Sequence, residues 1–391
     1  MTAPVPVIHI ITKLEFGGAQ QNTLYTVSAL DRERFTPVLL TGSEGYLMDE
    51  ARGLAEERKV ALEIVPGMER SIRPGRDWAA YREIVGLLDP YRGGPAIVHS
   101  HSSKAGILGR WAAWKAGIPV VIHSIHGFGF TPAQSPAKRW LFMTAEKATS
   151  KITDHFIAVS HANRKEGLRL GLFPPGGCTV IRSGFDLDLF RTAEKMSLNL
   201  STIINIPETS PVVLMVACLK PQKAPLDFVR VAARVHERIP DARFILAGDG
   251  ELKNAISNEI NHLGLSGIVL PLGWREDIPQ LMKSSRVVVL TSLWEGLPRV
   301  IPQAMAAGRP VVASAVDGSV EAVRDGVDGY LCEPGDVKTM AERVTALLLD
   351  PDKAAAMGRA GQGAVGEFDR DLMVRQQEEL YEQLLKEKGL W

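Results

Sequence analysis

The stretch "VVVLTSLWEGLPRVIPQAMAAGRPVVAS", residues 287–314, indicates how this chain folds. Two short apolar runs, Val287–Leu290 and Val311–Ala313, flank a helix-length segment, Leu297–Ala307. Continuous apolar runs of this length are typical of strands that are buried on both faces, as in parallel sheets covered by helices. The stretch therefore predicts a strand–helix–strand unit with a lone acid, Glu295, just after its first strand.

The same alternation runs through the whole chain and predicts an α/β protein of the doubly wound kind. Helix-length segments separate most of the predicted strands. These strands are Val5–Thr12, Thr36–Thr41, Ala61–Val65, Ala96–His99, Val120–His123, Phe156–Val159 and Thr179–Ile181 in the first half, and Val212–Ala217, Arg243–Ala247, Ile268–Pro271, Val287–Leu290, Val311–Ala313 and Gly329–Leu331 in the second.

One interruption of this rhythm divides the chain into two domains. Residues 191–210 lack the strand–helix pattern and end in a turn-rich sequence, which is typical of a linker. We therefore predict a Rossmann-like domain over 1–190, a second over 191–370, and a cleft between them. The last segment, 371–391, reads as one amphipathic helix that packs back on the first domain.

Composition excludes several classes of protein. The 45 basic residues balance the 45 acidic ones, and this disfavours nucleic acid as a partner. Three cysteines, Cys178, Cys218 and Cys332, have neither metal nor disulfide spacing, which fits a reducing compartment. We find no membrane-spanning apolar run and no basic region before the first apolar run, so we expect a soluble, cytoplasmic protein.

One segment leaves membrane contact open. Residues 135–152, "SPAKRWLFMTAEKATSKI", mix cations with Trp140, Leu141, Phe142 and Met143. A partly buried amphipathic helix and a helix that lies on the inner face of a membrane both fit this pattern.

Ligands of doubly wound sheets bind beyond the carboxyl ends of the strands, so the loops there are the first to consider. Gly17 and Gly18 open a helix, where free amides and a close backbone approach suit an anion. His126 lies in a glycine-rich loop after the fifth strand. It is either a satisfied buried histidine or a donor to a substrate hydroxyl or phosphate.

The loop after the fourth predicted strand is the most polar in the first half. His99 and His101 have a spacing that metal sites use, but no third ligand is evident, so we predict no metal site. We interpret His101, Ser103 and Lys104 as a polar wall on the acceptor side of the cleft. Ser102 or Ser103 would cap the next helix, and Lys104 would point to the ligand or to a lid over it.

The second half offers a candidate phosphate site. Lys220 and Lys223 lie where a strand gives way to a helix, an arrangement that suits a pyrophosphate unless the two are a solvated surface pair. Gly248 lies in a tight turn that is structural or ligand-binding. Trp274 and Arg275 follow the next strand, where stacking or backbone groups would hold a base.

Glu295 and Gln303 read as the two ends of a clamp. We expect both on one face of a helix, two turns apart, with Glu295 at a sugar and Gln303 at a ribose hydroxyl. The backbone amides of Gly296, Leu297 and Arg299 would hold a phosphate between them. This interpretation requires a Glu295 carboxylate that is not tied up in an internal ion pair. The alternative is an exposed acid and an amide without a ligand.

The segment 292–336, "SLWEGLPRVIPQAMAAGRPVVASAVDGSVEAVRDGVDGYLCEPGD", resembles the donor-binding signature of the family-4 retaining glycosyltransferases, which have the GT-B fold. The segments "LKPQKAP", "AGDGEL", "LGWREDI", "SGFDLDLF", "FGGAQ" and "HSSKAGILGR" are similar to others of that family. The likeness spans nearly the whole chain.

This resemblance implies that a sugar is transferred from a nucleotide diphosphate sugar with its anomeric configuration retained, without metal or other cofactor. The acid at Glu295 would contact the sugar. Two positions depart from the family pattern: Gln303 replaces the acid at the ribose, and Cys218 replaces an arginine at the phosphate. A neutral amide forms a weaker hydrogen bond than a carboxylate by about 1–2 kcal/mol.

We therefore predict a retaining glycosyltransferase that uses a UDP-sugar. Its acceptor would be a saccharide or a lipid-linked saccharide in polysaccharide biosynthesis at the cell surface. Catalytic roles fall to Glu295 and His126, because closure of the domains would bring His126 and the Gly17–Gly18 loop onto the sugar. A UDP-sugar 2-epimerase and a non-catalytic nucleotide-sugar-binding protein are the alternatives. Interconversion of the free donor would identify the first, and tight donor binding without UDP release the second.

Overall fold

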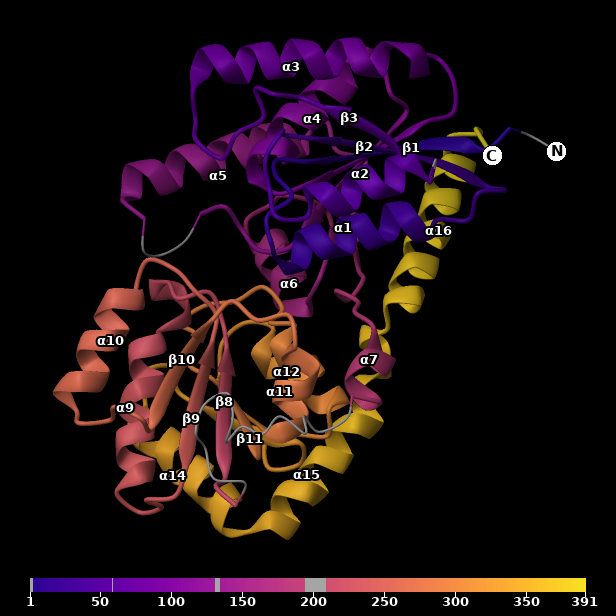
Figure 1. Cartoon of the computed structure of the whole chain (residues 1–391). Coiled ribbons are helices and arrows are strands. Elements are labelled where there is room, and N and C mark those ends of the chain that lie inside the picture. The colour runs from indigo at the N-terminus through magenta and orange to yellow at the C-terminus, as the bar shows by residue number, and fades with distance from the viewer. Residues whose placement is uncertain (1–2, 58, 131–133, 194–208) are drawn as a thin grey trace. The chain divides into compact units, whose positions relative to one another are not determined.

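The computed structural model describes residues 3–57, 59–130, 134–193 and 209–391. The chain divides into two compact units, which we call unit 1 (residues 1–184 with 370–391) and unit 2 (residues 185–369). Each unit contains one parallel sheet with helices, and this confirms the predicted doubly wound α/β class (Figure 1). Most of the predicted linker, residues 194–208, lies outside the described residues.

Unit 1 is built on a seven-stranded parallel sheet with the order β3-β2-β1-β4-β5-β6-β7. Every strand predicted in the first half is present. The strands are β1 (Val5–Ile11), β2 (Phe35–Thr41), β3 (Ala61–Ile64), β4 (Ile97–His101), β5 (Val120–Ile125), β6 (His155–Ala158) and β7 (Cys178–Val180). The prediction ended β4 at His99, whereas the strand continues to His101, so His99 lies within the strand.

Helices cover both faces of this sheet. They are α1 (Gly18–Ala29), α2 (Met48–Glu56), α3 (Pro74–Leu88), the 3-10 turn η1 (Asp89–Tyr91), α4 (Ser103–Ala116), α5 (Pro136–Ser150), α6 (His161–Arg169) and α16 (Arg370–Glu387). Ile8 and Ile10 of β1 pack in the same cluster as α3 and α4. Their neighbours Val7 and Ile11 point to the other face, where α16 and α1 lie, because side chains alternate along a strand.

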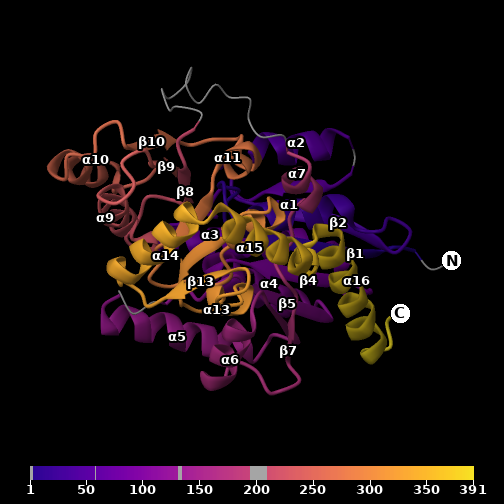
Figure 2. The same ribbon diagram turned by 90° about the horizontal axis from the view of Figure 1, so that it is seen from below.

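The C-terminal helix α16 belongs to the core of unit 1. Both views show it beside β1 (Figure 1, Figure 2). Tyr381 and Leu385 are fully buried against the sheet, and burial of such side chains contributes about 1.5–3 kcal/mol each. Glu378 accepts a hydrogen bond from the Asp31 amide at 2.7 Å and lies 3.3 Å from the Arg34 guanidinium. The helix is therefore held by apolar packing and by a charged rim.

Unit 2 contains a six-stranded parallel sheet with the order β10-β9-β8-β11-β12-β13. Every strand predicted in the second half is present. They are β8 (Val212–Val216), β9 (Arg243–Ala247), β10 (Val269–Gly273), β11 (Val287–Leu290), β12 (Val311–Ser314) and β13 (Gly329–Cys332). The helical segments are α7 (Leu187–Arg191), η2 (Pro221–Lys223), α9 (Pro225–His236), α10 (Lys253–His262), α11 (Ile278–Ser284), α12 (Val300–Ala306), α13 (Ser319–Ala322), α14 (Val337–Leu349), α15 (Pro351–Ala364) and η3 (Val365–Phe368).

The core of unit 2 explains why its strands read as continuous apolar runs. Val213 and Met215 of β8 pack against α9, α10 and α14 in one large cluster. Leu214, the residue between them, points to the opposite face and is also fully buried. A strand that is buried on both faces carries apolar residues at every position. Polar residues are thereby concentrated in the loops at the strand ends.

Candidate functional site

Three neighbouring strands of unit 2 bring the predicted donor residues together. β8, β11 and β12 are adjacent in the sheet and parallel, so the loops after them emerge side by side at its carboxyl edge. These loops carry Lys223, Glu295 and Asp317 respectively. Strand order, rather than distance along the chain, therefore assembles the site.

The centre of this site is an ion pair between Lys223 and Glu295. The Lys223 ammonium contacts Oε1 of Glu295, and the Ser292 hydroxyl donates to the same oxygen at 2.5 Å. The Glu295 side chain is only 6% exposed. The sequence-based prediction of a Glu295 carboxylate free of internal ion pairs was therefore wrong. Its partner, however, is itself a residue predicted to bind the donor.

Hydrogen bonds hold the loop around this pair in one conformation. The Glu295 amide donates to Oδ2 of Asp317 at 2.7 Å. The Leu293 amide donates to the Gln222 carbonyl at 2.8 Å, and the Gln222 side chain donates to the Trp294 carbonyl at 2.8 Å. Backbone groups that would be orphaned at a strand end are thus satisfied between loops.

Sequence reasoning passed over Ser292, Asp317 and Gln222. Asp317 follows the strand next to β11, and its backbone has a positive φ of 39°. Ligands of such sheets bind beyond the carboxyl ends of the strands, so Asp317 lies where a ligand-binding residue is expected. Which of these loops lie next to each other depends on the strand order, which the sequence does not give. The sequence signal that could have identified these residues is a polar side chain just after a predicted strand.

Gln303 does not share a helix face with Glu295. The predicted helix began at Leu297, whereas α12 begins at Val300, so Glu295 lies in the loop before it. The carbonyl of Gly296 accepts from the Gly318 amide at 3.2 Å, which ties this loop to the one after β12. Gln303 is half-buried within α12, and its side-chain amide makes no hydrogen bond to a residue that the structure describes. Its role at a ribose stays a prediction.

Lys220 and Lys223 flank a turn rather than the first turn of a long helix. Lys220 precedes the 3-10 turn η2, which ends at Lys223, and α9 begins only at Pro225. Thr291 donates to the carbonyl of Lys223 at 2.8 Å and to that of Ala224 at 3.0 Å. The backbone of Lys223 is therefore anchored to the loop that carries Glu295.

Gly248 lies in a turn that no other residue fits. Its φ is 139°, and a Cβ there would press into the carbonyl oxygen of Ala217. Close approach of two backbones requires glycine at such a position. The Leu219 amide donates to the Asp249 carbonyl at 2.9 Å, so this turn also supports the chain that leads to Lys220.

We expect Gly248→Ala to lower the free energy of unfolding of unit 2 by about 4 kcal/mol, because backbone strain and overpacking each cost about 1–3 kcal/mol. Gly264→Ala is the matched control, since Gly264 also has a positive φ, of 68°, but has open space where a Cβ would lie. That change costs about 1 kcal/mol. Urea unfolding measures both, and equal losses would contradict the backbone clash.

The remaining predicted donor residues are dispersed along the loops of unit 2. Arg275 forms an ion pair with Asp277, with two contacts at 2.8 and 2.5 Å. Trp274 beside it is 56% exposed, and Leu297 is buried. Burial lowers the pKa of Arg299 to about 10, which leaves the guanidinium charged at neutral pH.

In unit 1, Lys104 does not reach toward a ligand. Its ammonium contacts the Asp77 carboxylate and donates to the Ser71 carbonyl at 2.6 Å, and the side chain is 13% exposed. Neither serine caps α4 with its side chain, because the Ser102 hydroxyl instead bonds to that of Thr12 at 2.8 Å. Ser103 begins the helix and is exposed. Part of the predicted polar wall therefore forms hydrogen bonds and an ion pair with other residues of unit 1.

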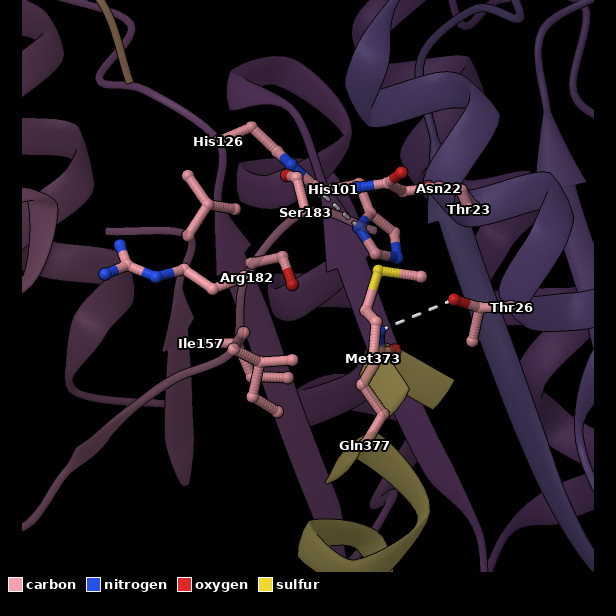
Figure 3. Close-up of a pocket in the computed structure, with 13 residues that line it drawn as sticks. Asn22, Thr23, Thr26, His101, His126, Ile157, Arg182, Ser183, Met373 and Gln377 are labelled. Atoms are coloured by element: carbon pink, nitrogen blue, oxygen red, sulfur yellow. Dashed lines mark hydrogen bonds between the residues drawn. The ribbon is translucent and has the colours of Figure 1, made fainter. Parts of the chain in front are cut away.

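His101 and His126 meet at a small pocket within unit 1. Nδ1 of His101 lies 3.2 Å from Nε2 of His126, at the carboxyl ends of β4 and β5. Figure 3 shows the two imidazoles turned toward each other. Residues of β5, β6, α1 and α16 and of the segments after β6 and β7 complete the lining: Asn22, Thr23, Thr26, Ser124, Ile157, Val159, Ile181, Arg182, Ser183, Met373 and Gln377. Gly17 and Gly18 lie at the start of α1, with Gly17 in the N-cap position.

Behind His101 lies a buried histidine cluster that sequence reasoning missed. Nδ1 of His9 lies 3.0 Å from Nε2 of His101, and His9 pairs with His99 across β1 and β4. His99 contacts the Tyr381 hydroxyl at 2.6 Å and the Ser124 hydroxyl at 2.8 Å. Burial lowers the pKa of His9 to about 3 and lowers the pKa values of His99 and His101 well below 6.5. All three are neutral imidazoles at neutral pH.

Comparison with known proteins assigns the chain to a family. Residues 198–364 match the family model "Glycosyl transferases group 1", and residues 16–189 match "Glycosyltransferase Family 4". The chain is also 33% identical over 336 residues to the Escherichia coli UDP-Gal:alpha-D-GlcNAc-diphosphoundecaprenol alpha-1,3-galactosyltransferase, covering 85% of each protein. The chain is a family-4 glycosyltransferase. The resemblance inferred from the sequence is thereby confirmed.

Other relatives of this glycosyltransferase carry related names. It is 28% identical over 299 residues to the Campylobacter jejuni N,N'-diacetylbacillosaminyl-diphospho-undecaprenol alpha-1,3-N-acetylgalactosaminyltransferase, which spans 74% of this chain and 77% of that protein. A putative glycosyltransferase of Bacillus subtilis, EpsD, is 29% identical over 80% of this chain and 83% of its own length.

Solved structures establish the GT-B fold of this glycosyltransferase. Anabaena HepE in complex with UDP-glucose superposes with a TM-score of 0.80 at 24% identity, covering 97% of this chain and 99% of that one. Sucrose-phosphate synthase of Thermosynechococcus elongatus gives a TM-score of 0.77 at 20% identity, covering 98% and 99%. At this level of identity the likeness concerns the fold alone. In the described part of the chain, no helix has the length and apolar character needed to cross a bilayer.

Proposed function

We propose that this glycosyltransferase transfers a sugar, with retention of configuration, from a UDP-sugar to a lipid-linked saccharide in the synthesis of a cell-surface polysaccharide or glycoconjugate. The observation that carries the proposal is the Lys223–Glu295 pair at the edge of the unit 2 sheet. It places an ammonium and a carboxylate, the groups needed for a diphosphate and for sugar hydroxyls, in direct contact within one rigid loop assembly.

In this proposal the pair exchanges partners when the donor binds. An arriving diphosphate offers Lys223 several charged oxygens in place of one carboxylate oxygen, and charge-assisted bonds of this kind contribute about 1.5–3 kcal/mol each. Glu295 then keeps its hydrogen bond from Ser292 and turns its other oxygen to a sugar hydroxyl. In the transfer step, Lys223 stabilises the charge that grows on the leaving UDP. No metal ion is needed for this arrangement.

The donor and acceptor classes rest on the relatives. The E. coli relative is named for a UDP-Gal donor and a diphosphoundecaprenol-linked acceptor, and the C. jejuni relative for a diphospho-undecaprenol-linked acceptor. HepE has been solved with UDP-glucose. In this proposal His126, Gly17 and Gly18 keep their predicted roles toward the sugar and phosphate, and His101 and Ser103 keep theirs on the acceptor side. Lys104 is left out, because it is paired with Asp77.

A transfer assay tests this function. The purified chain is given a panel of UDP-, GDP- and ADP-sugars with a polyprenyl-diphosphate-linked saccharide, and product and released nucleotide are measured. We expect one UDP-sugar to raise the melting temperature and to be consumed with an α-linked product, as shown by NMR. Donor binding without UDP release from any acceptor would favour a non-catalytic sensor, and interconversion of the free donor would favour an epimerase. Gln303→Glu is expected to retain transfer.

A lipid-linked acceptor requires access to a membrane surface, and α5 offers one. Trp140 and Leu141 on this helix are 64% and 55% exposed, next to the exposed cations Lys138 and Arg139. Exposed aromatic and aliphatic side chains beside cations suit the headgroup region of an anionic leaflet. We therefore propose that the protein is cytoplasmic and lies peripherally on the inner face of the cell membrane through α5.

We expect the double change Trp140→Ser and Leu141→Ser to weaken binding to anionic phospholipid vesicles at least about 10-fold, since each side chain contributes about 1.5–3 kcal/mol when buried. Trp78→Ser on α3, at a tryptophan that is 62% exposed, should leave binding unchanged. Vesicle sedimentation measures both variants. Equal binding of the double variant and the parent chain would exclude α5 as the contact.

A further inference from the structure

The histidine cluster of unit 1 has the composition of a metal site. His9, His99 and His101 come from the two central strands β1 and β4, and all lie on the face covered by α1 and α16. One ring nitrogen from each of the three lies within 4.8 Å of the other two. His9 and His99 have no exposed surface, and His101 is 4% exposed. The sequence suggested only a pair, because the third histidine lies 92 positions from His101.

The distances within the cluster suit a common ion. Zn²⁺ binds imidazole nitrogen at about 2.0–2.1 Å in a tetrahedral arrangement, so two of its ligands lie about 3.3 Å apart. His9 Nδ1 and His101 Nε2 are 3.0 Å apart. The third nitrogen lies no more than 4.8 Å from the other two, so a shift of at most about 1.5 Å brings it to the same separation. The three rings therefore lie within a small rearrangement of a shared ion.

The hydrogen bonds around the cluster match those that orient metal-binding histidines. A ligating histidine commonly holds its second nitrogen on a hydrogen-bond partner. His101 has His126 at 3.2 Å for this purpose, and His99 has the hydroxyls of Ser124 and Tyr381 at 2.8 and 2.6 Å. When one nitrogen of His99 binds an ion, the other nitrogen keeps its hydroxyl as a hydrogen-bond partner.

One atom of the cluster is unsatisfied without an ion. Nε2 of His9 is buried and has no hydrogen-bond partner among the described residues. A buried polar atom without a partner costs about 1–3 kcal/mol. A metal ion bound to Nε2 of His9 satisfies this atom, whereas an ion bound to Nδ1 replaces the hydrogen bond between His9 and His101. His101 also lines the small pocket, which is the side from which an ion would reach the cluster.

We propose that His9, His99 and His101 bind a transition-metal ion, with Zn²⁺ as the reference ion. Imidazole nitrogens suit Zn²⁺, Cu²⁺, Ni²⁺ and Fe²⁺, and the cluster contains no carboxylate that would favour Mg²⁺ or Ca²⁺. The ion cross-links β1 to β4 beneath α16 and stabilises unit 1. This site is separate from the Lys223–Glu295 pair and does not depend on the proposed function.

A zinc titration of the full chain tests the site. The chain is first stripped with a chelator, and Zn²⁺ is then added against a competing indicator. We expect one Zn²⁺ per chain, a higher melting temperature with Zn²⁺, and at least about 100-fold weaker binding in His9→Gln. His155→Gln is the matched control, because His155 is also buried but bonds to Thr179 at 2.9 Å outside the cluster. It should bind zinc as the parent chain does.

X-ray absorption of the zinc-loaded parent chain gives a second readout that needs no variant. We expect imidazole scattering from nitrogens at about 2.0 Å. Less than one tightly bound Zn²⁺ per chain, oxygen-only coordination, or full affinity in a folded His9→Gln chain would each overturn the site. The three rings would then be a hydrogen-bonded network that anchors the sheet. None of these measurements depends on sugar transfer, so their outcome stands even if the proposed function is wrong.

Discussion

Glu295→Gln is expected to lower the rate of sugar transfer at least about 100-fold while UDP still binds. The change keeps the shape of the side chain and its hydrogen bond from Ser292, but it removes the charge that contacts Lys223. Loss of one preorganised electrostatic contact in an active site typically costs 10²–10³-fold in rate. UDP affinity should stay within about threefold, because Lys223 remains available to the diphosphate.

Two measurements separate this effect from misfolding. UDP release gives the rate, and calorimetry with UDP gives the affinity of the folded variant. Glu333→Gln is the matched control, since Glu333 is an exposed acid of the same unit and its replacement should change neither. Turnover of Glu295→Gln near that of the parent chain would remove Glu295 from the proposed mechanism. Loss of both UDP binding and the cooperative unfolding transition would show that the ion pair is structural.

Acidification is expected to destabilise unit 1 strongly, because the folded unit buries histidines in their neutral form. The folded pKa of His9 is lowered to about 3, and the pKa values of His99, His101 and His123 are lowered well below 6.5, mainly by burial. The unfolded chain takes up protons near its ordinary pKa of about 6.5. Stability is therefore fully present above pH 6.5 and is lost as the pH falls toward the folded pKa values.

Between pH 7.5 and 5.5 each of these histidines costs about 1.4 kcal/mol, so the four together remove about 5.5 kcal/mol from the free energy of unfolding of unit 1. Urea unfolding of chelator-treated protein measures this loss, and hydrogen exchange in β1 and β4 assigns it to unit 1. Stability between pH 8.5 and 7.5 should be constant. His123→Gln should reduce the loss by about a quarter. A flat profile down to pH 5.5 would mean that the cluster takes up protons while folded.

The site could be predicted in parts but not as an assembly. Lys223 and Glu295 each follow an apolar strand, and residues in that position can be identified from the sequence as candidates for ligand binding. Their direct contact depends on β8 and β11 being neighbours. Asp317 was missed for the same reason, since its partner is the Glu295 amide, which lies 22 positions earlier.

Predicted contacts and element ends were wrong where a local sequence pattern fits more than one tertiary arrangement. Lys104 was expected to face a ligand, but it pairs with Asp77 of α3 because α3 packs beside α4. The polar run that begins at His99 was read as a strand end, whereas β4 continues because a buried cluster satisfies its histidines. The helix after Glu295 begins later than predicted, because its loop is hydrogen-bonded to the loop after β12.

The sequence by itself determined the α/β class and the approximate position of each strand that the structure describes. These properties follow from runs of apolar residues along the chain, and burial on two faces of a parallel sheet imposes such runs on each strand separately. The tertiary structure alone decided which polar residues meet: Lys223 with Glu295, and His9 with His99 and His101. Strand order brings distant residues together, and no local pattern encodes that order, because neighbouring strands such as β8, β11 and β12 carry similar apolar runs.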